Sequence, residues 1–291
     1  MNKVITVTGG KGGVGKTFVT VNLASVLARL ERKRVLIVDI DVSNPCVSTL
    51  IKSDVERRKP IKVFRPKLLN EKCVLCGECV RHCPVHALLL IPTKKLIFIE
   101  TLCEGCAICL YVCPVQAITE DERTVGWINV TSERNLTRVI YGELVPGNRQ
   151  EGEVMERTLE FSKQYWDNYD YVIIDTPPGT GKGIMRAIEE SDLILSVTEP
   201  TRLGLHDLKK LHSLVKKVGK YEIVVLNKYG IPYGDYGEIE NFVNSEGLKV
   251  YKIPYNDLAI RSYFEGKSML EYGMKYETLK GFREIANDIL L

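Results

Sequence analysis

The chain has 291 residues, with 40 lysine and arginine residues, 37 aspartate and glutamate residues, and a formal net charge of +3. This near balance produces no overall field that would favour nucleic acid or a membrane surface as a partner. No apolar run approaches the roughly 20 residues that span a bilayer, and Met1 leads directly into VITVT without the regions of a signal peptide. We therefore expect a cytoplasmic protein without a membrane-targeting helix, forming one large domain or two modest ones.

Short apolar runs rich in β-branched residues predict buried parallel strands at Val4–Thr8, Val35–Val38, Tyr171–Ile174, Leu193–Val197 and Ile223–Leu226. Helical stretches lie between some of these runs, at Phe18–Leu30 and His206–Val218. Alternating strands and helices predict an α/β fold with a doubly wound, mostly parallel sheet that is covered on both faces. The C-terminal segment FREIANDILL has mixed charge, so we expect it to cover the sheet and not to lie on a membrane.

The α/β pattern stops between about Asp54 and Glu120, where the cysteines are concentrated. Residues 73–88 read CVLCGECVRHCPVHAL and residues 103–118 read CEGCAICLYVCPVQAI, so the segment contains an internal repeat. Eight of the nine cysteines lie in these two copies. In a protein of the reducing cytosol, such cysteines are more often metal ligands or redox groups than disulfides.

We predict that residues 64–118 form a small inserted domain, resembling a bacterial ferredoxin, and that residues 1–63 and 119–291 together form the larger domain around it. The basic, proline-containing run at 57–67 leads into the insert. Its simplest interpretation is a solvated linker, because charged runs are usually exposed to water. A docking surface for an acidic electron-transfer partner is the alternative.

Residues 10–17 read GKGGVGKT and match the phosphate-binding pattern G-x-x-x-x-G-K-[ST] between a strand and a helix. Phosphate oxygens must come close to backbone N–H groups, and a Cβ would obstruct that approach, which explains the glycines at positions 9, 10, 12, 13 and 15. The helix directs its positive end at the phosphates, Lys16 is expected to neutralise the β- and γ-phosphates, and the Thr17 hydroxyl is expected to bind Mg²⁺. The predicted ATP contacts are Gly10, Lys11, Gly12, Gly13, Val14, Gly15, Lys16 and Thr17.

An extra lysine near the start of this loop, Lys11, is not required by the general pattern, and an exposed lysine is its simplest interpretation. However, KGGVGKT resembles the deviant Walker A motif of the MinD/ParA-type (SIMIBI) P-loop ATPases. That resemblance implies an enzyme that hydrolyses ATP and forms an ATP-dependent homodimer, in which Lys11 reaches the nucleotide of the partner subunit. It makes Lys11, Lys16 and Asp41 the expected catalytic residues.

Two acidic motifs extend this resemblance: VLIVDIDVSNP places Asp39 and Asp41 beyond the second strand, and YVIIDTPPGTG places Asp175 at the end of another. The family implies that Asp41 positions or activates the attacking water, that Asp39 belongs to the Mg²⁺ shell, and that Asp175 holds Mg²⁺ through water. LNK and IPYND resemble the adenine-side segments of the family, which implies nucleotide contacts by Asn227 and Pro254. Solvated or capping aspartates, a strand-end asparagine and a turn proline are the alternatives.

Both repeats have the cysteine spacing C-x₂-C-x₂-C-x₃-C-P, which is the spacing of bacterial ferredoxins. The resemblance implies two [4Fe–4S] clusters, each held by three closely spaced cysteines and by the fourth cysteine of the other repeat. The expected ligand sets are Cys73, Cys76, Cys79 and Cys113 for the first cluster, and Cys103, Cys106, Cys109 and Cys83 for the second. Two zinc sites of four cysteines each are the alternative, although zinc usually takes its thiolates in C-x₂₋₄-C pairs.

Over nearly its full length, the chain resembles MinD-superfamily ATPases that contain an inserted two-cluster ferredoxin domain. The Mrp-type carriers and the nitrogenase iron protein hold a cluster between two subunits with paired cysteines of the ATPase body. Here that body has only Cys46, which we expect to be a small buried residue. His206 is expected to be a structural histidine at a helix start.

The combination of an ATPase with two redox centres favours an ATP-dependent protein that passes electrons to an unidentified acceptor. The first alternative is an assembly or maturation factor that loads clusters or metal into a client metalloprotein. The second alternative is a positioning ATPase of the MinD type, whose clusters are structural or sense oxygen.

Overall fold

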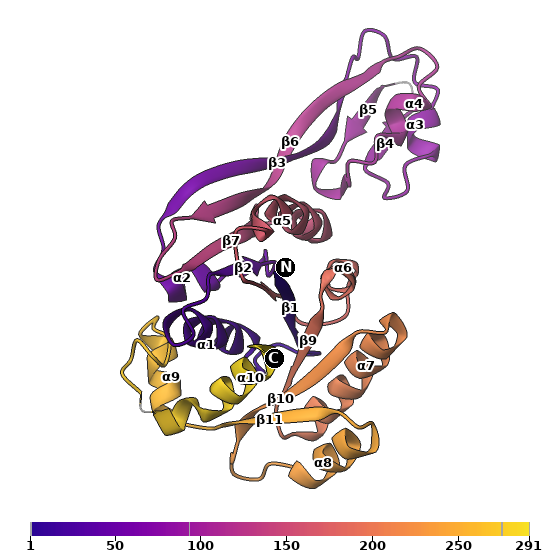
Figure 1. The fold of residues 1–291 in the computed structure, drawn as a ribbon. Helices are drawn as coiled ribbons and strands as arrows, with labels where there is room; N and C mark the ends of the chain where they lie inside the picture. Colours follow the sequence, from indigo (N-terminus) through magenta and orange to yellow (C-terminus); the bar gives the residue numbers. More distant parts are fainter. Residues whose placement is uncertain (1, 93, 275, 291) are drawn as a thin grey trace.

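The structure, a computed structural model, describes residues 2–92, 94–274 and 276–290 (Figure 1). Within these ranges nine strands form the main sheet, in the order β11-β10-β9-β1-β8-β2-β7-β6-β3. The strands from β11 to β7 in this order are parallel, and β6 and β3 continue the sheet in antiparallel pairing. The parallel strands are β1 (Lys3–Thr8), β2 (Val35–Asp39), β7 (Thr137–Leu144), β8 (Tyr171–Asp175), β9 (Leu193–Thr198), β10 (Tyr221–Tyr229) and β11 (Lys249–Pro254).

Helices cover both faces of the sheet (Figure 1). One face packs against α1 (Lys16–Arg29), α2 (Val47–Ile51), α9 (Asp257–Phe264) and α10 (Lys280–Leu290), which share one apolar core with the strands. The other face packs against α5 (Glu151–Trp166), α6 (Lys182–Glu190) and α7 (Arg202–Val218), and α8 (Tyr236–Ser245) shares a smaller core with α7 and β10. In the part of the chain that the structure describes, no helix is long and apolar enough to cross a membrane.

Burial explains why the central strands could be predicted. Every residue of β2 and of β8 is buried, because helices lie on both faces, and such strands have continuous rather than alternating apolar runs. The five predicted strands and the mostly parallel, doubly wound sheet are therefore confirmed. The C-terminal helix buries Phe282, Ile285 and Ile289 in the core, which confirms that this segment covers the sheet.

The basic run at 57–67 is not a linker. It lies in β3 (Val55–Leu68), which pairs along its length with β6 (Ile118–Thr131), and these two long strands form an arm that leads away from the sheet (Figure 1). Some of its charges are paired with acidic side chains, as in Arg58–Glu143 at 2.9 Å and Lys62–Glu122 at 2.9 Å. Prolines 60 and 66 cannot donate backbone hydrogen bonds, which is typical of an edge strand. The strand was missed because eight of its fourteen residues are exposed and seven are charged, so no apolar pattern marks it.

At the end of the arm, residues 69–117 form a lobe with a two-stranded sheet, β4 (Leu88–Ile91) and β5 (Lys95–Phe98). The lobe also contains the short helices α3 (Glu78–Arg81), α4 (Ile108–Tyr111) and η1 (Glu100–Leu102). The two sequence repeats have matching left-handed backbone positions, at Leu75 and Gly105, Gly77 and Ala107, and His86 and Gln116. Because β3 and β6 run without interruption from the body into the lobe, the boundaries at 64 and 118 remain a prediction.

Candidate nucleotide site and cysteine cavities

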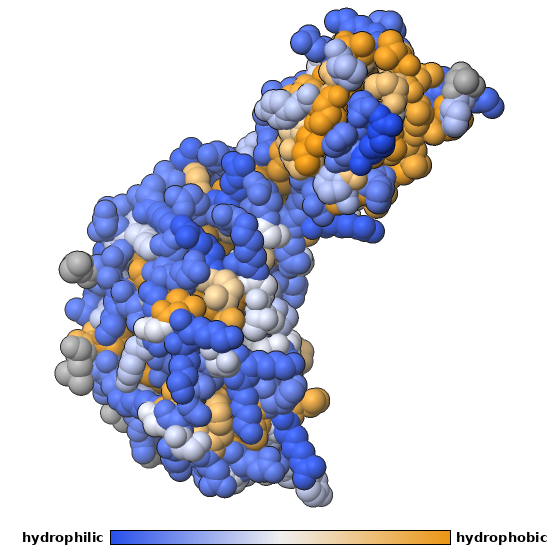
Figure 2. Space-filling view, turned by 90° about the vertical axis from the view of Figure 1, so that its right-hand side faces the viewer, coloured by the Kyte–Doolittle hydropathy of each residue, from blue (hydrophilic) through white to orange (hydrophobic). Residues whose placement is uncertain are grey.

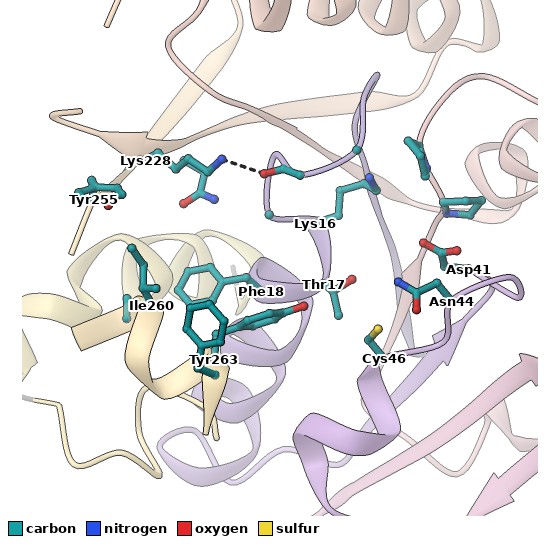
Figure 3. A pocket seen from close by; sticks show the side chains of 18 of the residues that line it. Lys16, Thr17, Phe18, Asp41, Asn44, Cys46, Lys228, Tyr255, Ile260 and Tyr263 are labelled. Atoms are coloured by element: carbon teal, nitrogen blue, oxygen red, sulfur yellow. Dashed lines mark hydrogen bonds between the residues drawn. The ribbon is translucent and has the colours of Figure 1, made fainter. Parts of the chain in front are cut away.

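A cavity of about 910 Å³ lies at the carboxyl ends of the parallel strands (Figure 3). Several predicted site residues line it: the ATP-binding candidates Gly12, Gly13, Gly15, Lys16, Thr17, Asn227 and Pro254, and the catalytic candidate Asp41. Two other residues of the phosphate loop pack away from it, since Val14 is buried in the core and Gly10 lies against Asp207 of α7. The fold thus brings together loop, strand-end and adenine-side segments that are more than two hundred residues apart in the chain.

The phosphate loop is braced by the strand that carries Asn227. Gly15 has a φ of 98°, which favours glycine, and a Cβ there would collide with the Asn227 amide. Asn227 Nδ2 donates a hydrogen bond to the Val14 carbonyl oxygen at 2.8 Å. The next residue, Lys228, donates to the Gly13 carbonyl oxygen at 2.8 Å. Besides its predicted place near adenine, the LNK segment therefore holds the loop in shape.

Lys16 is a buried cation at the base of the cavity. Its Nζ lies 3.3 Å from the Lys11 carbonyl oxygen. Burial lowers its pKa, although the carboxylates of Asp175 and Asp41 act in the opposite direction. A partly desolvated ammonium at this position interacts strongly with an incoming anion, because the low local polarity strengthens electrostatic attraction.

Asp175 is in direct contact with two hydroxyl groups of α1, those of Thr17 and Thr20. The Thr17 hydroxyl donates to Asp175 Oδ2 at 2.7 Å, and the Thr20 hydroxyl donates to Asp175 Oδ1 at 2.9 Å. Burial raises the pKa of Asp175 to about 6. A hydroxyl and a carboxylate in contact at the start of α1 are hard oxygen ligands of the type that Mg²⁺ prefers.

The two aspartates after β2 differ in environment. Asp39 is fully buried, and its carboxylate accepts hydrogen bonds from the N–H groups of Asp41 at 3.0 Å and Val47 at 3.2 Å. Burial, followed by the nearby Asp175, raises the pKa of Asp39 well above its usual range. Asp41 lines the cavity, and burial raises its pKa as well. Asp39 therefore shapes the loop that presents Asp41, and the catalytic and Mg²⁺ roles of the pair remain predictions.

The extra lysine of the loop is held within its own chain. Lys11 Nζ forms an ion pair with Glu199 at 2.6 Å, and Lys228 pairs with the other oxygen of Glu199 at 2.7 Å. Burial favours the neutral acid, but the hydrogen bonds from the two lysines lower the pKa of Glu199 overall. Lys228 belongs to the LNK segment predicted to lie near adenine, but no sequence pattern predicts that Glu199 joins it to Lys11.

Several lining residues were missed or wrongly placed by the sequence. Cys46 was expected to be buried, but it is partly exposed and lines the cavity near Thr17 (Figure 3). Burial, and then the nearby carboxylates, raise the pKa of its thiol. Tyr255 and the α9 residues Ala259, Ile260, Tyr263 and Phe264 also line the cavity, as does Glu151 at the start of α5. His206 lies in the first turns of α7, as expected for a helix-start histidine.

In the lobe, the cysteines of the two repeats line two separate small cavities. One is lined by Cys73, Cys76, Cys79 and Cys113, and the other by Cys83, Cys103, Cys106 and Cys109. Each cavity thus takes three cysteines from one repeat and the fourth from the other. Backbone N–H groups donate to the sulfur atoms at matching positions, from Ala87 to Cys83 Sγ and from Ala117 to Cys113 Sγ, both at 3.2 Å.

Crowding of the thiols affects their protonation. Burial raises the pKa of Cys109 to about 11, and neighbouring cysteines add to this effect. Burial also raises the pKa of Cys79 and of Cys103. Over residues 2–92, 94–274 and 276–290, no group of three or more histidine, cysteine or acidic side chains is arranged so that it could hold a metal ion.

Comparisons with known proteins identify the family of the chain. Residues 2–228 match the family model of the AAA domain. The uncharacterized protein MJ0579 of Methanocaldococcus jannaschii is 30% identical over 293 residues, which are 99% of this chain and 97% of that protein. The iron-sulfur cluster carrier protein of the same organism is 28% identical over 219 residues, covering 73% of this chain and 54% of that protein.

The fold has a solved counterpart in the cell division ATPase MinD of Pyrococcus furiosus, with a TM-score of 0.63 and 23% identity, covering 99% of this chain and 98% of that one. The chain belongs to the AAA domain family. Within it, the protein is a P-loop ATPase of the MinD/ParA type, which confirms the predicted ATP-binding enzyme and its mostly parallel α/β sheet.

Proposed function

We propose that this ATPase couples the nucleotide state of its body to electron transfer through two [4Fe–4S] clusters in the lobe of residues 69–117. The observation that carries the proposal is the division of eight cysteines between two cavities in the crossed sets that the ferredoxin spacing implies. Residues 64–118 would then act as the inserted ferredoxin-like domain. When bound, the clusters would supply one-electron transfer.

The donor sets fit such clusters. Each cavity offers four sulfur ligands and apolar walls, which include Leu90, Leu96 and Ile118 in one and Phe64 and Phe98 in the other. Backbone N–H groups that point at the sulfur atoms stabilise thiolates and tune a cluster. A cubane spreads its four thiolates over four different irons, so its ligands need not converge as closely as those of a single zinc ion. This difference is consistent with the lack of a single-ion site among the described residues.

The ATPase part of the proposal assigns roles to residues of the large cavity. Lys16 would neutralise the β- and γ-phosphates, and Thr17 and Asp175 would hold Mg²⁺. Asp41 would orient the attacking water. In an ATP-dependent homodimer, Lys11 would leave Glu199 and reach the nucleotide of the partner subunit.

A protein partner is needed to accept the electrons, and the lobe has a surface that suits one. Large apolar side chains are exposed on it, including Val74 at 62% and Leu89 at 47% exposure. Figure 2 shows apolar residues gathered over one face of this lobe. Two of the cluster cysteines, Cys76 and Cys106, are themselves exposed, which would shorten the path for an electron to a docked partner.

Metal analysis tests the proposal directly. Protein purified anaerobically should contain about eight iron and eight acid-labile sulfide per chain, as two cubanes require. Two zinc ions without sulfide would refute it.

A maturation factor is the second candidate, favoured by the similarity to an iron-sulfur cluster carrier protein. The MinD-type positioning role is supported by the fold and by the sequence similarity to septum site-determining MinD proteins. Identification of proteins that co-purify under anaerobic conditions separates the three: a redox enzyme supports electron transfer, an apo-metalloprotein supports maturation, and division or chromosome proteins support positioning.

A further inference from the structure

Two neighbouring residues at the start of α5 lie between the nucleotide cavity and the cysteine lobe. Glu151 lines the nucleotide cavity and accepts a hydrogen bond from the Ser43 hydroxyl at 3.1 Å. Gln150, immediately before it, contacts the lobe, because a Cβ on Gly105 would lie 3.5 Å from Gln150 Nε2. Adjacent positions of one helix start therefore touch both functional parts of the molecule.

The segment of the lobe that Gln150 contacts is the loop between Cys103 and Cys106. Gly105 in this loop has a φ of 75° and packs closely on the arm, where a Cβ would lie 3.1 Å from the Phe64 carbonyl oxygen. Arg123 of β6 donates to the carbonyl oxygens of Glu100 at 3.0 Å and Cys103 at 2.5 Å. The loop is thus held between the arm and α5.

The first repeat is placed differently. A Cβ on Gly77, two residues beyond the position that corresponds to Gly105, would lie 3.5 Å from Leu90 of the lobe itself. The cavity lined by Cys73, Cys76, Cys79 and Cys113 has walls from the lobe and the first residue of β6, whereas the other cavity includes Phe64 and Pro66 of β3. The second cavity is therefore the one connected to the ATPase body by direct contacts.

The Gln150 side chain is buried, but one of its polar atoms has no hydrogen bond. It is only 8% exposed, and its Oε1 has no hydrogen-bond donor among the described residues. A buried carbonyl oxygen without a hydrogen bond is unfavourable. A small movement of Gln150 that brings a donor to its Oε1 would therefore stabilise a second conformation of this side chain. Its side chain makes no capping hydrogen bond to α5, so it is not required for the helix to start.

We infer that Gln150 is a positioning residue that transmits the nucleotide state from Ser43 and Glu151 to the Cys103–Cys106 loop. Ser43 follows Asp41, and loops at this position become ordered by the γ-phosphate in P-loop proteins. A shift of Ser43 would move Glu151 and the start of α5, and with it the contact to Gly105. ATP should then affect the cavity lined by Cys83, Cys103, Cys106 and Cys109 more than the cavity lined by Cys73, Cys76, Cys79 and Cys113. An effect of ATP on iron–sulfur clusters rests on the proposed function, whereas the contact between the start of α5 and the cysteine lobe does not.

Hydrogen exchange of the anaerobically purified full chain tests the inference, with and without a saturating non-hydrolysable ATP analogue and Mg²⁺. The amide hydrogen exchange rate of residues 103–109 should change by about fivefold or more on addition of the analogue. Fivefold is about the lower end of the changes in affinity by which two coupled sites affect each other. Residues 73–79 should change less. Gln150→Ala and Ser43→Ala should each abolish the difference between the two segments.

The matched control is Gln164→Ala on the same helix, whose exposed side chain bonds only to the Phe161 carbonyl oxygen of α5. This variant should respond to the analogue like the parent. An unchanged response in Gln150→Ala or Ser43→Ala, or an equal response of both segments in the parent, would overturn the inference. Iron analysis of the same samples keeps the two proposals apart, since a chain without iron that still shows the response refutes only the iron–sulfur proposal.

Discussion

Thr17 and Asp175 are separated by 158 positions in the chain, yet the Thr17 hydroxyl donates to Asp175 Oδ2 at 2.7 Å. The contact exists because β1 and β8 are neighbours in the sheet and both end at the same edge. It joins the phosphate loop to the second acidic motif and brings together two side chains that we propose hold Mg²⁺.

The stability of the nucleotide-free protein should depend on Asp175. Its folded-state pKa, about 6, is above the ordinary value of 3.8, so the ionised carboxylate destabilises the fold above about pH 6, and this cost disappears as the pH falls toward 4. Asp175→Asn should therefore increase the free energy of unfolding at pH 7, by up to about 3 kcal/mol, because the pKa is raised by roughly two units and each unit corresponds to about 1.4 kcal/mol. Denaturant titrations at pH 7 and pH 4 check this, and a gain that is equal at both pH values would contradict it.

Lys16→Ala should reduce ATP hydrolysis by about 10²–10³-fold, the range found when a group that stabilises transition-state charge is removed. The variant removes the buried ammonium at the base of the cavity, so ATP affinity should fall as well. Calorimetric titration with ATP and a phosphate-release assay measure the two effects. The exposed Lys210→Ala of α7 is the control and should match the parent in both assays.

Asp41→Asn should retain ATP binding but lose hydrolysis by about 10²-fold or more, the usual contribution of a positioned general base. Its size is unchanged, and Asp39 still accepts the hydrogen bond from the backbone N–H at this position. We expect the variant to accumulate as an ATP-bound dimer. Turnover at the parent rate would show that another residue orients the water.

Lys11→Ala should bind ATP but fail to form the ATP-dependent dimer, because its proposed contact is to the nucleotide of the partner subunit. Light scattering after size-exclusion chromatography, with ATP and Mg²⁺, measures the mass. Glu199→Gln weakens the ion pair that holds Lys11 within its own subunit, so this variant should dimerise at lower ATP concentration than the parent. A stable dimer of Lys11→Ala would remove the proposed role of this lysine.

Cys83→Ser should lose about four of the eight expected irons, and the loss should concern the cluster of the second repeat, because Cys83 shares its cavity with Cys103, Cys106 and Cys109. Electron paramagnetic resonance of the reduced protein distinguishes the two clusters. Cys46→Ser, in the nucleotide cavity, is the control and should retain all iron. A Cys83→Ser signal that lacks the cluster of the first repeat would contradict the crossed arrangement.

Local sequence patterns were enough to predict much of the fold and many of the candidate site residues. The glycine-rich loop around Lys16 and the continuous apolar runs of β2 and β8 each lie within a few consecutive residues, where backbone conformation and burial leave a direct signature. The same holds for the cysteine spacing, which led to the crossed sets that the two cavities contain. Such segments are predictable because their constraints act between near neighbours in the chain.

Long-range contacts required the tertiary structure. No pattern marks Glu199 as the partner of Lys11, and nothing near Gln150 indicates that it meets Gly105, because each contact joins segments that come together only when the sheet and the arm have formed. The charged strand β3 is stabilised by pairing with β6 and by ion pairs to distant acidic residues, so its sequence has no apolar period. The sequence by itself determined the chemistry that each segment carries, whereas packing of distant segments decided which of these groups meet.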